Sequence, residues 1–579
     1  PWDTASPPDE HRTFLLSDYQ FRPAQHVVFE RWVNRLCTEE AVQRLSQVQI
    51  DFDPETEAIE VHHLRLWRDR QVEREGEVER FIFRQRESDL DIQILHGEVS
   101  ALLVMDGVRP GDAIDVCYSR RRIKMLEGEK PARLFTLDRE IPIGRWHASI
   151  HLDGEEKPEV KIHGEGRFEP EIRPAEAGEI WSWSGSRTEP IASEEGVPAW
   201  EPLVPLGQYS FFRDWGEVVQ VMHGSWASLE DVEIDASTVV DIERGEPVEE
   251  TALKLTHYVQ DNVRYLGLEM GLGGMVPSPP GEVLNRLYGD CKDKSVLLSA
   301  LFRSVGIEAH PVLVHTIFRK TVDRFLPGLA CFNHVIVTFV LDGKRGFIDP
   351  TRLKAGGSIF EQNLPDYGFG LVVEPGSSAL LEIPYTGDIR SWWTIEEAFD
   401  LSLAGSSSLE IKLDATGEHA DMLRARVAME GREAFLRAEV EDLGQIFKEV
   451  QPDPSGGIEL EDDRQRNRTH LRLKFQFSDW GVRDETGTQH FAYAPRWFTR
   501  LITLPPIREE TRREEYVQPY PLKIDYTAKV SGVELARSND TMRVNGNGFQ
   551  AKGRLESLGR DDVQVTYFFE AAAEVVPPR

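Results

Sequence analysis

Residues 288–306 read YGDCKDKSVLLSALFRSVG, and this stretch decides the fold of the chain around it. Asp290 is a favourable helix N-cap, and Asp293 follows three residues later in the capping-box position. Gly306 supplies a helix stop. Apolar residues recur three and four positions apart on one face: Val296, Leu297, Ala300, Leu301 and Val305. The pattern therefore predicts an amphipathic helix whose first residue is Cys291.

The start of this helix is a favourable place for a reactive thiol. Unpaired backbone N–H groups and the positive end of the helix dipole stabilise a thiolate at Cys291. Asp290 and Asp293 oppose ionisation, whereas Lys292 and Lys294 assist it, so the helix alone does not determine the state of the thiol. A lone cysteine is also commonly a small buried apolar residue, and that alternative stays open unless a histidine partner is found.

The residues after this helix predict three strands. His334 opens the second strand and Asp349 ends the third, with an Asp342-Gly343 hairpin signal between them. The two residues are 15 positions apart, so a tight turn brings them side by side, where the carboxylate can hold the histidine ring in one tautomer. The 43 positions between Cys291 and His334 leave room for the helix, one strand and a loop. A thiol triad of Cys291, His334 and Asp349 is thereby complete.

The motifs GDCKDKS, FNHVIV and FIDPT occur in this order, and together they closely resemble the transglutaminase-like (papain-like) cysteine enzymes. The resemblance extends over about residues 215–351. It implies a catalytic triad of Cys291, His334 and Asp349, with no cofactor and no metal. Phe347 departs from the family, whose members often have Trp before the Asp, but it leaves the triad intact.

Short alternating runs before about residue 170 predict a β-rich N-terminal domain. Its stretch LHGEVSALLVMDGVRPGDAIDVCYS resembles the β-rich domain of unknown function that precedes transglutaminase-like domains in many bacterial envelope proteins. Strand patterns return after about residue 386, with one helical stretch at 432–449, and predict a C-terminal β-sandwich-like domain. We therefore expect a multidomain α+β chain with a β-rich domain and connector at 1–205, a transglutaminase-like catalytic domain at 206–385 and a β-rich domain at 386–579.

Composition excludes several classes of function. The 579 residues include 67 Lys plus Arg and 99 Asp plus Glu, and a formal charge of −32 would repel nucleic acid and anionic lipid. The apolar runs are too short for a membrane-spanning helix. Four cysteines without a C-x-x-C pair disfavour structural zinc and a disulfide scaffold.

The compartment is predicted from several features together. The chain opens at Pro1, so we expect that an N-terminal segment has been removed. With the acidic composition and the envelope resemblance, this favours a periplasmic or secreted protein, although the composition fits a cytoplasmic one nearly as well.

The triad predicts an acyl-enzyme catalyst that acts on amide bonds of peptides or proteins. The Cys291 backbone N–H is the expected oxyanion donor, and a second donor is expected from an upstream residue such as Tyr265 or from the backbone of Glu269. Water as acceptor would make the protein a cysteine protease or amidase, and an amine acceptor would make it a transglutaminase. The alternative is a non-catalytic envelope module that uses the same fold to bind a partner.

Overall fold

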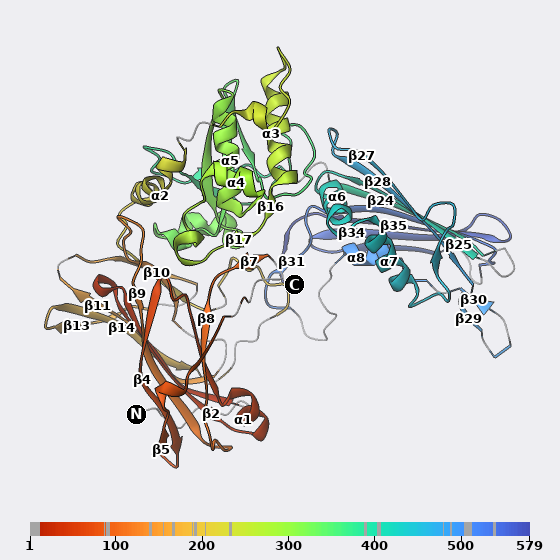
Figure 1. Cartoon of the computed structure of the whole chain (residues 1–579). Helices are drawn as coiled ribbons and strands as arrows, with labels where there is room; N and C mark the ends of the chain where they lie inside the picture. Colours follow the sequence, from red (N-terminus) through yellow and green to blue (C-terminus); the bar gives the residue numbers. More distant parts are fainter. Residues whose placement is uncertain are drawn as a thin grey trace.

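The structure is a computed structural model, and it describes residues 12–85, 87, 93–137, 142–154, 156–164, 168–187, 189, 194–202, 204–230, 234–386, 391–401, 407–478, 480–483, 485–486, 489–491, 493–502, 512–535 and 540–578. Its elements group into an N-terminal β-rich region, a central region of helices and strands, and a C-terminal β-rich region (Figure 1). The predicted multidomain α+β architecture is confirmed. None of the described helices is long and apolar enough to cross a membrane.

An eight-stranded sheet forms the body of the N-terminal region. Its strands follow the order β13-β14-β11-β1-β2-β9-β4-β5. Their bounds are β1 Arg12–Arg22, β2 Val27–Leu36, β4 Glu57–Arg68, β5 Gln71–Glu75, β9 Ala113–Arg122, β11 Ile143–Asp153, β13 Glu171–Ala175 and β14 Gly178–Arg187. Helix α1 (Glu39–Leu45) and the small sheet of β3 (Gln47–Phe52), β8 (Val99–Val104) and β6 (Ile82–Gln85) cover one side of it and share an apolar core with β4 and β9.

A second small sheet connects this region to the centre of the chain. Strand β15 (Leu206–Ser210) lies between β10 (Ala132–Thr136) and β12 (Glu159–His163) and pairs antiparallel with both. β15 begins where the predicted central domain begins, yet both of its partners are N-terminal strands. The domain boundaries at 205 and 385 stay predictions.

The central region packs four helices against a five-stranded sheet. The helices are α2 (Trp215–Glu230), α3 (Val248–Asn262), α4 (Pro280–Arg286) and α5 (Cys291–Ser304). The sheet has the order β21-β20-β19-β22-β23, with β19 Glu308–Val314, β20 His334–Leu341, β21 Lys344–Ile348, β22 Phe369–Val372 and β23 Leu381–Glu382. Figure 1 shows α5 in the middle of this region, and it packs directly on β19 and β20.

Helix α5 begins at Cys291, and β20 pairs with β21 as a hairpin, so both predictions are confirmed. The predicted amphipathic character differs, because every residue from 291 to 302 is buried, the charged ones included. The reason is that α2, α3 and α4 contact this helix on the sides that the sheet leaves open.

One large sheet forms the C-terminal region, in the order β26-β28-β25-β24-β32-β35-β34-β33, with β27 also paired to β28. The bounds are β24 Trp392–Asp400, β25 Ser407–Thr416, β26 Gln451–Pro452, β27 Ile458–Asp463, β28 Arg468–Phe477, β32 Lys523–Ser531, β33 Asp540–Asn545, β34 Phe549–Ser557 and β35 Asp562–Ala571. The β-rich prediction is confirmed. The core of this sheet is closed by helices α6 (Glu418–Glu430), α7 (Arg432–Leu443) and α8 (Arg496–Leu501), whose residues Leu423, Phe435 and Trp497 are buried against the strands.

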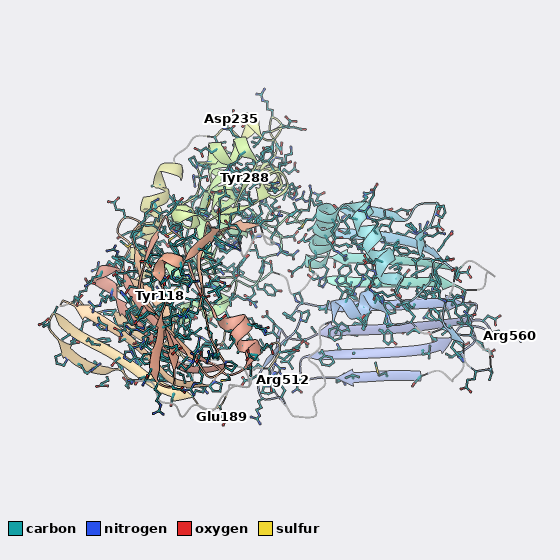
Figure 2. All side chains as sticks on the ribbon, turned by 60° about the horizontal axis from the view of Figure 1, so that its bottom comes forward. Tyr118, Glu189, Asp235, Tyr288, Arg512 and Arg560 are labelled. Carbon is teal, nitrogen blue, oxygen red and sulfur yellow. The ribbon has the colours of Figure 1, made fainter. Side chains whose placement is uncertain are left out.

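The three regions contact one another through polar groups of the backbone and side chains. β7 (Ile94–Leu95) of the N-terminal region pairs with β17 (Gly267–Leu268) of the central region. The carboxylate of Asp261 on α3 pairs with Arg464, which lies between β27 and β28. Arg512 lies between the N-terminal and C-terminal regions (Figure 2) and donates to the Glu195 carbonyl at 2.8 Å. The central region therefore forms hydrogen bonds or ion pairs with both the N-terminal and the C-terminal region.

Candidate active site

The first turn of α5 is fixed by its N-cap. The Asp290 carboxylate accepts hydrogen bonds from the N–H groups of Lys292 and Asp293, both at 3.1 Å, and also pairs with the Lys292 ammonium. This cap does not engage the N–H of Cys291, the first helical residue. The Cys291 side chain is buried, with the residue 8% exposed.

The other two charged residues of the motif, Asp293 and Lys294, also have hydrogen-bond partners. Asp293 accepts from the Ser278 N–H and from Arg286, each at 2.6 Å. Lys294 donates to the Val263 carbonyl at 2.7 Å, and its burial lowers its pKa to about 8. These residues build the helix start and tie it to the preceding segments, which accounts for charged residues around a buried thiol.

The structure brings Cys291, His334 and Asp349 together. Nε2 of His334 lies 3.1 Å from Oδ2 of Asp349 across the β20–β21 hairpin, and Cys291 lies close enough to the imidazole to raise its pKa. The hydroxyl of Ser295 on α5 donates to the Val335 carbonyl at 3.0 Å, which fixes the thiol helix against the histidine strand. Because Nε2 faces the carboxylate, Nδ1 is the ring nitrogen available to the thiol.

Electrostatics in this site favours a charged histidine. Burial opposes protonation of His334, but the charge and hydrogen bond of Asp349, aided by Cys291, raise its pKa to about 10. Burial likewise opposes ionisation of Asp349, but the His334 charge and hydrogen bonds from its neighbours hold its pKa well below the ordinary value. An imidazolium between a carboxylate and a thiol is the arrangement that stabilises a thiolate.

Three further residues hold Asp349, and sequence reasoning did not find them. The Tyr367 hydroxyl donates to Oδ2 at 2.7 Å, and the Thr351 hydroxyl donates to Oδ1 at 2.6 Å. The side-chain amide of Gln260 on α3 donates to the Asp349 carbonyl at 3.2 Å. Thr351 could have been found, since a Thr two residues after an Asp suits a local turn, whereas Tyr367 and Gln260 lie in segments without a recognisable motif.

The two residues predicted upstream of the thiol have different positions. Tyr265 lies in β16 (Arg264–Tyr265), which pairs with β18 (Tyr288–Gly289) directly before Cys291. Burial, followed by the neighbouring Cys291 and Asp290 side chains, raises the pKa of its phenol above the ordinary value. The phenol is therefore neutral and near the thiol.

The prediction for Glu269 is wrong. Its backbone N–H donates to the Leu95 carbonyl at 2.8 Å, and its carboxylate faces His96 at 3.4 Å. The donor is taken by the pairing of β17 with β7, a strand about 170 residues upstream, which local sequence patterns do not reveal.

The remaining cysteines differ from Cys291 in their surroundings. Burial raises the pKa of the Cys117 thiol to about 11 and that of Cys331 to about 12. None of the four cysteines, all of which lie in the described part of the chain, forms a disulfide. Of the described His, Cys, Asp and Glu residues, the group Glu308, His310 and Glu374 has ligand atoms within 4.8 Å of one another. It lies at the end of β19 opposite to Val314, which pairs with His334, so it is separate from the triad.

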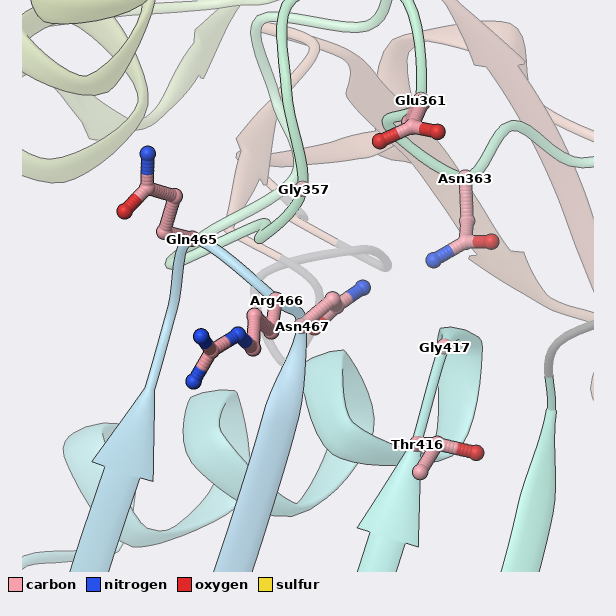
Figure 3. Close-up of a pocket in the computed structure, with 8 residues that line it drawn as sticks. All are labelled: Gly357, Glu361, Asn363, Thr416, Gly417, Gln465, Arg466 and Asn467. Carbon is pink, nitrogen blue, oxygen red and sulfur yellow. The ribbon is translucent and has the colours of Figure 1, made fainter.

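Two cavities lie at domain junctions. One, of about 350 Å³, lies between residues 357–363 and the loops of the C-terminal sheet (Figure 3). There the side-chain amides of Asn363 and Asn467 extend toward the same space, while Gln465 and Arg466 point away from it. The other, of about 370 Å³, lies between the N-terminal and central regions and is lined by Phe332, two residues before His334. Of these two cavities, only the second is lined by a residue of the segment that leads to His334.

Comparison with known proteins agrees with this architecture. Residues 23–192 match the model of a domain of unknown function with a solved structure, DUF3857, and residues 236–348 match that of the Transglutaminase-like superfamily. The second match includes Cys291 and His334 and ends one residue before Asp349. No curated protein sequence matches the chain.

Solved structures extend the likeness to the whole chain. A crystal structure described as a "putative protease" from Parabacteroides distasonis ATCC 8503 has a TM-score of 0.64 and 13% identity, covering 99% of this chain and 95% of that one. A "putative cysteine protease" from Cytophaga hutchinsonii aligns over 56% of this chain and 76% of that chain at 9% identity. Its TM-score of 0.15 is too low to show a shared fold. The first likeness shows a shared fold over all three regions. The chain therefore has a β-rich N-terminal domain that matches DUF3857, a central transglutaminase-like domain and a C-terminal β-rich region.

Proposed function

We propose that the central domain is a thiol acyl-transfer enzyme that acts on amide bonds of peptides or proteins. The observation that carries the proposal is the contact of His334 with Asp349 at 3.1 Å beside the buried Cys291, an arrangement in which the Asp349 charge raises the His334 pKa to about 10. The description of the structural relative as a protease supports a peptide amide as the bond attacked.

The reaction follows from these roles. The Cys291 sulfur attacks the amide carbonyl carbon, and the C–N bond breaks as His334 gives its proton to the leaving amine. Asp349 keeps the ring oriented throughout. Water or a second amine then attacks the thioester, loses a proton to His334 and releases the thiolate. Each step balances without a metal or cofactor.

The tetrahedral intermediate carries a negative oxygen that needs donors. The Cys291 N–H at the start of α5 is the first donor, because Asp290 caps the two N–H groups that follow it and not this one. The phenol of Tyr265 is the second, since it is neutral and lies near the thiol.

Alkylation of the four thiols tests the proposal. Iodoacetamide at neutral pH, followed by peptide mapping, should label Cys291 first, because burial keeps Cys117 and Cys331 protonated. Cys291→Ala should also lose the ability to cleave a mixed peptide pool, whereas the matched control Cys37→Ala should keep it. Equal labelling of all four cysteines, with no cleavage or transfer, would instead support a binding module.

The acceptor is identified by a second measurement on the same enzyme. Cleavage in ¹⁸O water should place the label in the new carboxyl group if the protein is a hydrolase. Incorporation of a fluorescent primary amine into the acyl donor would identify a transglutaminase.

We also propose that the protein acts in the periplasm or outside the cell. The proposal is supported by the N-terminal domain, whose pattern resembles that of bacterial envelope proteins, and by the acidic composition. Fractionation of cells that express the full gene tests it, and recovery of the protein only with cytoplasmic markers would contradict it.

A further inference from the structure

The cavity between the N-terminal and central domains has the size and lining of a ligand pocket. Its volume is about 370 Å³, within the usual range for such sites. Six of its nine lining residues are apolar, namely Ala132, Phe212, Met275, Leu329, Ala330 and Phe332, and the other three are charged. Ala132 comes from β10 of the N-terminal domain, so the pocket is formed by two domains.

The pocket shares part of its wall with the apolar cluster that contains Cys291. Cys291 belongs to the same apolar cluster as Phe212, Met275 and Phe332. Phe332 is extended, with φ −134° and ψ 143°, and the next residue, Asn333, donates its N–H to Val314 at 3.0 Å, which prolongs the β20–β19 pairing. Phe332 packs against this cluster, which also contains Val335, the residue after His334 on β20.

The small sheet of β10, β15 and β12 holds this wall by buried hydrogen bonds. The Gln208 side chain on β15 donates to the Leu326 carbonyl at 2.9 Å and accepts from the Leu326 N–H at 2.8 Å. The Ser210 hydroxyl donates to the Pro327 carbonyl at 2.5 Å. Gln208 and Ser210 are 2% and 1% exposed. The segment that leads to Phe332 and His334 is thus anchored on the strand that pairs with β10.

The charges around the pocket are paired with one another. Arg122 pairs with Glu129, and Lys130 pairs with Glu217 on α2 at 2.8 Å. Glu217 also accepts from Arg213. Each of the three lining charges, Arg122, Glu129 and Lys130, thus has a partner of opposite sign, and a charged ligand group would have to displace one. An uncharged apolar side chain meets no such cost.

We propose that the DUF3857 domain and the transglutaminase-like domain together form a specificity pocket that takes an apolar side chain of the polypeptide whose amide Cys291 attacks. The inference rests on the proposed function and extends it by naming the substrate class and the domain that selects it. Leucine-like and phenylalanine-like side chains fit the lining, and glycine or charged side chains do not use it.

Peptidyl electrophiles test the inference on the full chain. The probes are tripeptide acyloxymethyl ketones in which one residue at a time is Gly, Leu, Phe, Asp or Lys, and the rate of Cys291 modification is measured by mass spectrometry. At one position, Leu or Phe should react at least about tenfold faster than Gly, Asp or Lys, the usual gain from filling an apolar pocket. Iodoacetamide, which needs no pocket, provides the reference rate.

Two variants fill the pocket from opposite sides. Ala132→Trp acts from the N-terminal domain and Ala330→Trp from the central domain, so that misfolding of one leaves the other informative. Each should abolish the preference for Leu or Phe while the iodoacetamide rate stays within about twofold. Ala175→Trp, at an exposed position of β13, is the matched control and should keep the preference.

The possible results separate the two proposals. Selective iodoacetamide labelling of Cys291 without any side-chain preference, or with a preference that both Trp variants retain, would overturn the pocket and leave the thiol enzyme intact. Equal labelling of all four cysteines by iodoacetamide would overturn both.

Discussion

Two buried carboxylates, one in the central domain and one in the C-terminal region, accept hydrogen bonds from tyrosine hydroxyls, yet their pKa values move in opposite directions. Asp349 accepts from Tyr367 at 2.7 Å, and its pKa is held well below the ordinary value. Glu397 on β24 accepts from Tyr526 at 2.5 Å and Tyr493 at 3.1 Å, and burial raises its pKa to about 7.

The difference lies in the counter-ion. Asp349 faces the His334 imidazole at 3.1 Å, whereas the groups that hydrogen bond to Glu397 are neutral hydroxyls. Arg500 acts on Glu397 by charge, but its guanidinium is bonded to Glu439 and Asp442. At Glu397 the hydroxyls do not offset the cost of desolvation, whereas at Asp349 the His334 charge, together with the hydroxyl hydrogen bonds, does. The charge of His334 therefore accounts for the lowered pKa of Asp349, which Glu397 lacks.

Removal of the cation should have the largest effect. We expect His334→Ala to lower acyl transfer at least about a hundredfold, because both the proton donor and the partner of the thiolate are lost. Initial rates on a cleaved peptide measure this. Glu397→Gln, which alters the other carboxylate, should leave the rate within about twofold, and a comparable loss in both variants would indicate a general effect on folding.

Replacement of Asp349 by a neutral residue should show how much its charge raises the pKa of His334. Asp349→Asn leaves burial to act on His334, so its pKa should fall from about 10 to below the ordinary value. We expect a loss of acyl transfer of about tenfold to a hundredfold, smaller than for His334→Ala, because tyrosine and threonine hydroxyls still orient the side chain. NMR titration of the imidazole measures the pKa, and an unchanged midpoint would contradict the assigned coupling.

The His334–Asp349 pair should also make the free energy of unfolding depend on pH. His334, with a raised pKa, stabilises the fold fully below its unfolded value near 6.5, and this is lost as pH rises toward 10. Asp349, with a lowered pKa, stabilises the fold above about pH 4, and this is lost as pH falls further. The pair should thus contribute most between about pH 4 and 6.5, and denaturant titrations of Asp349→Asn should lack this maximum.

The opposite sign is expected for the C-terminal carboxylate. Glu397 binds a proton more tightly in the folded state, with a pKa of about 7, than in the unfolded state near 4.3, so stability falls as pH rises through this window. Glu397→Gln mimics the protonated form and should raise the free energy of unfolding by about 3 to 4 kcal/mol at pH 8, with little change at pH 4. Destabilisation at pH 8 would show that the ionised carboxylate is favourable there.

The two sites also differ in how much of their structure could be predicted from the sequence. The helix start at Cys291, the hairpin from His334 to Asp349 and the order of the triad follow from local patterns, because caps, turns and strand alternation act over a few residues. The Glu269 donor was predicted wrongly and Tyr367 was missed, because their partners are set by tertiary contacts. The burial of Glu397 is of the same kind, since Tyr493 and Tyr526 lie about a hundred residues away.

The smallest effect is expected from single hydroxyls, and it tests whether the tyrosines have different roles in the two sites. Tyr367→Phe removes one hydrogen bond from an ionised Asp349, so acyl transfer should fall about twofold to tenfold, the scale of one such bond. Because this hydrogen bond lowers the Asp349 pKa, its loss should also shift the acid limb of the pH–rate profile upward. Tyr493→Phe, the matched change beside Glu397, should leave the profile unchanged and raise the pKa of Glu397 further above 7, since that hydrogen bond opposes the effect of burial. A shift of the acid limb in both variants would mean that the C-terminal core communicates with the triad, and the two carboxylates could no longer be treated as independent.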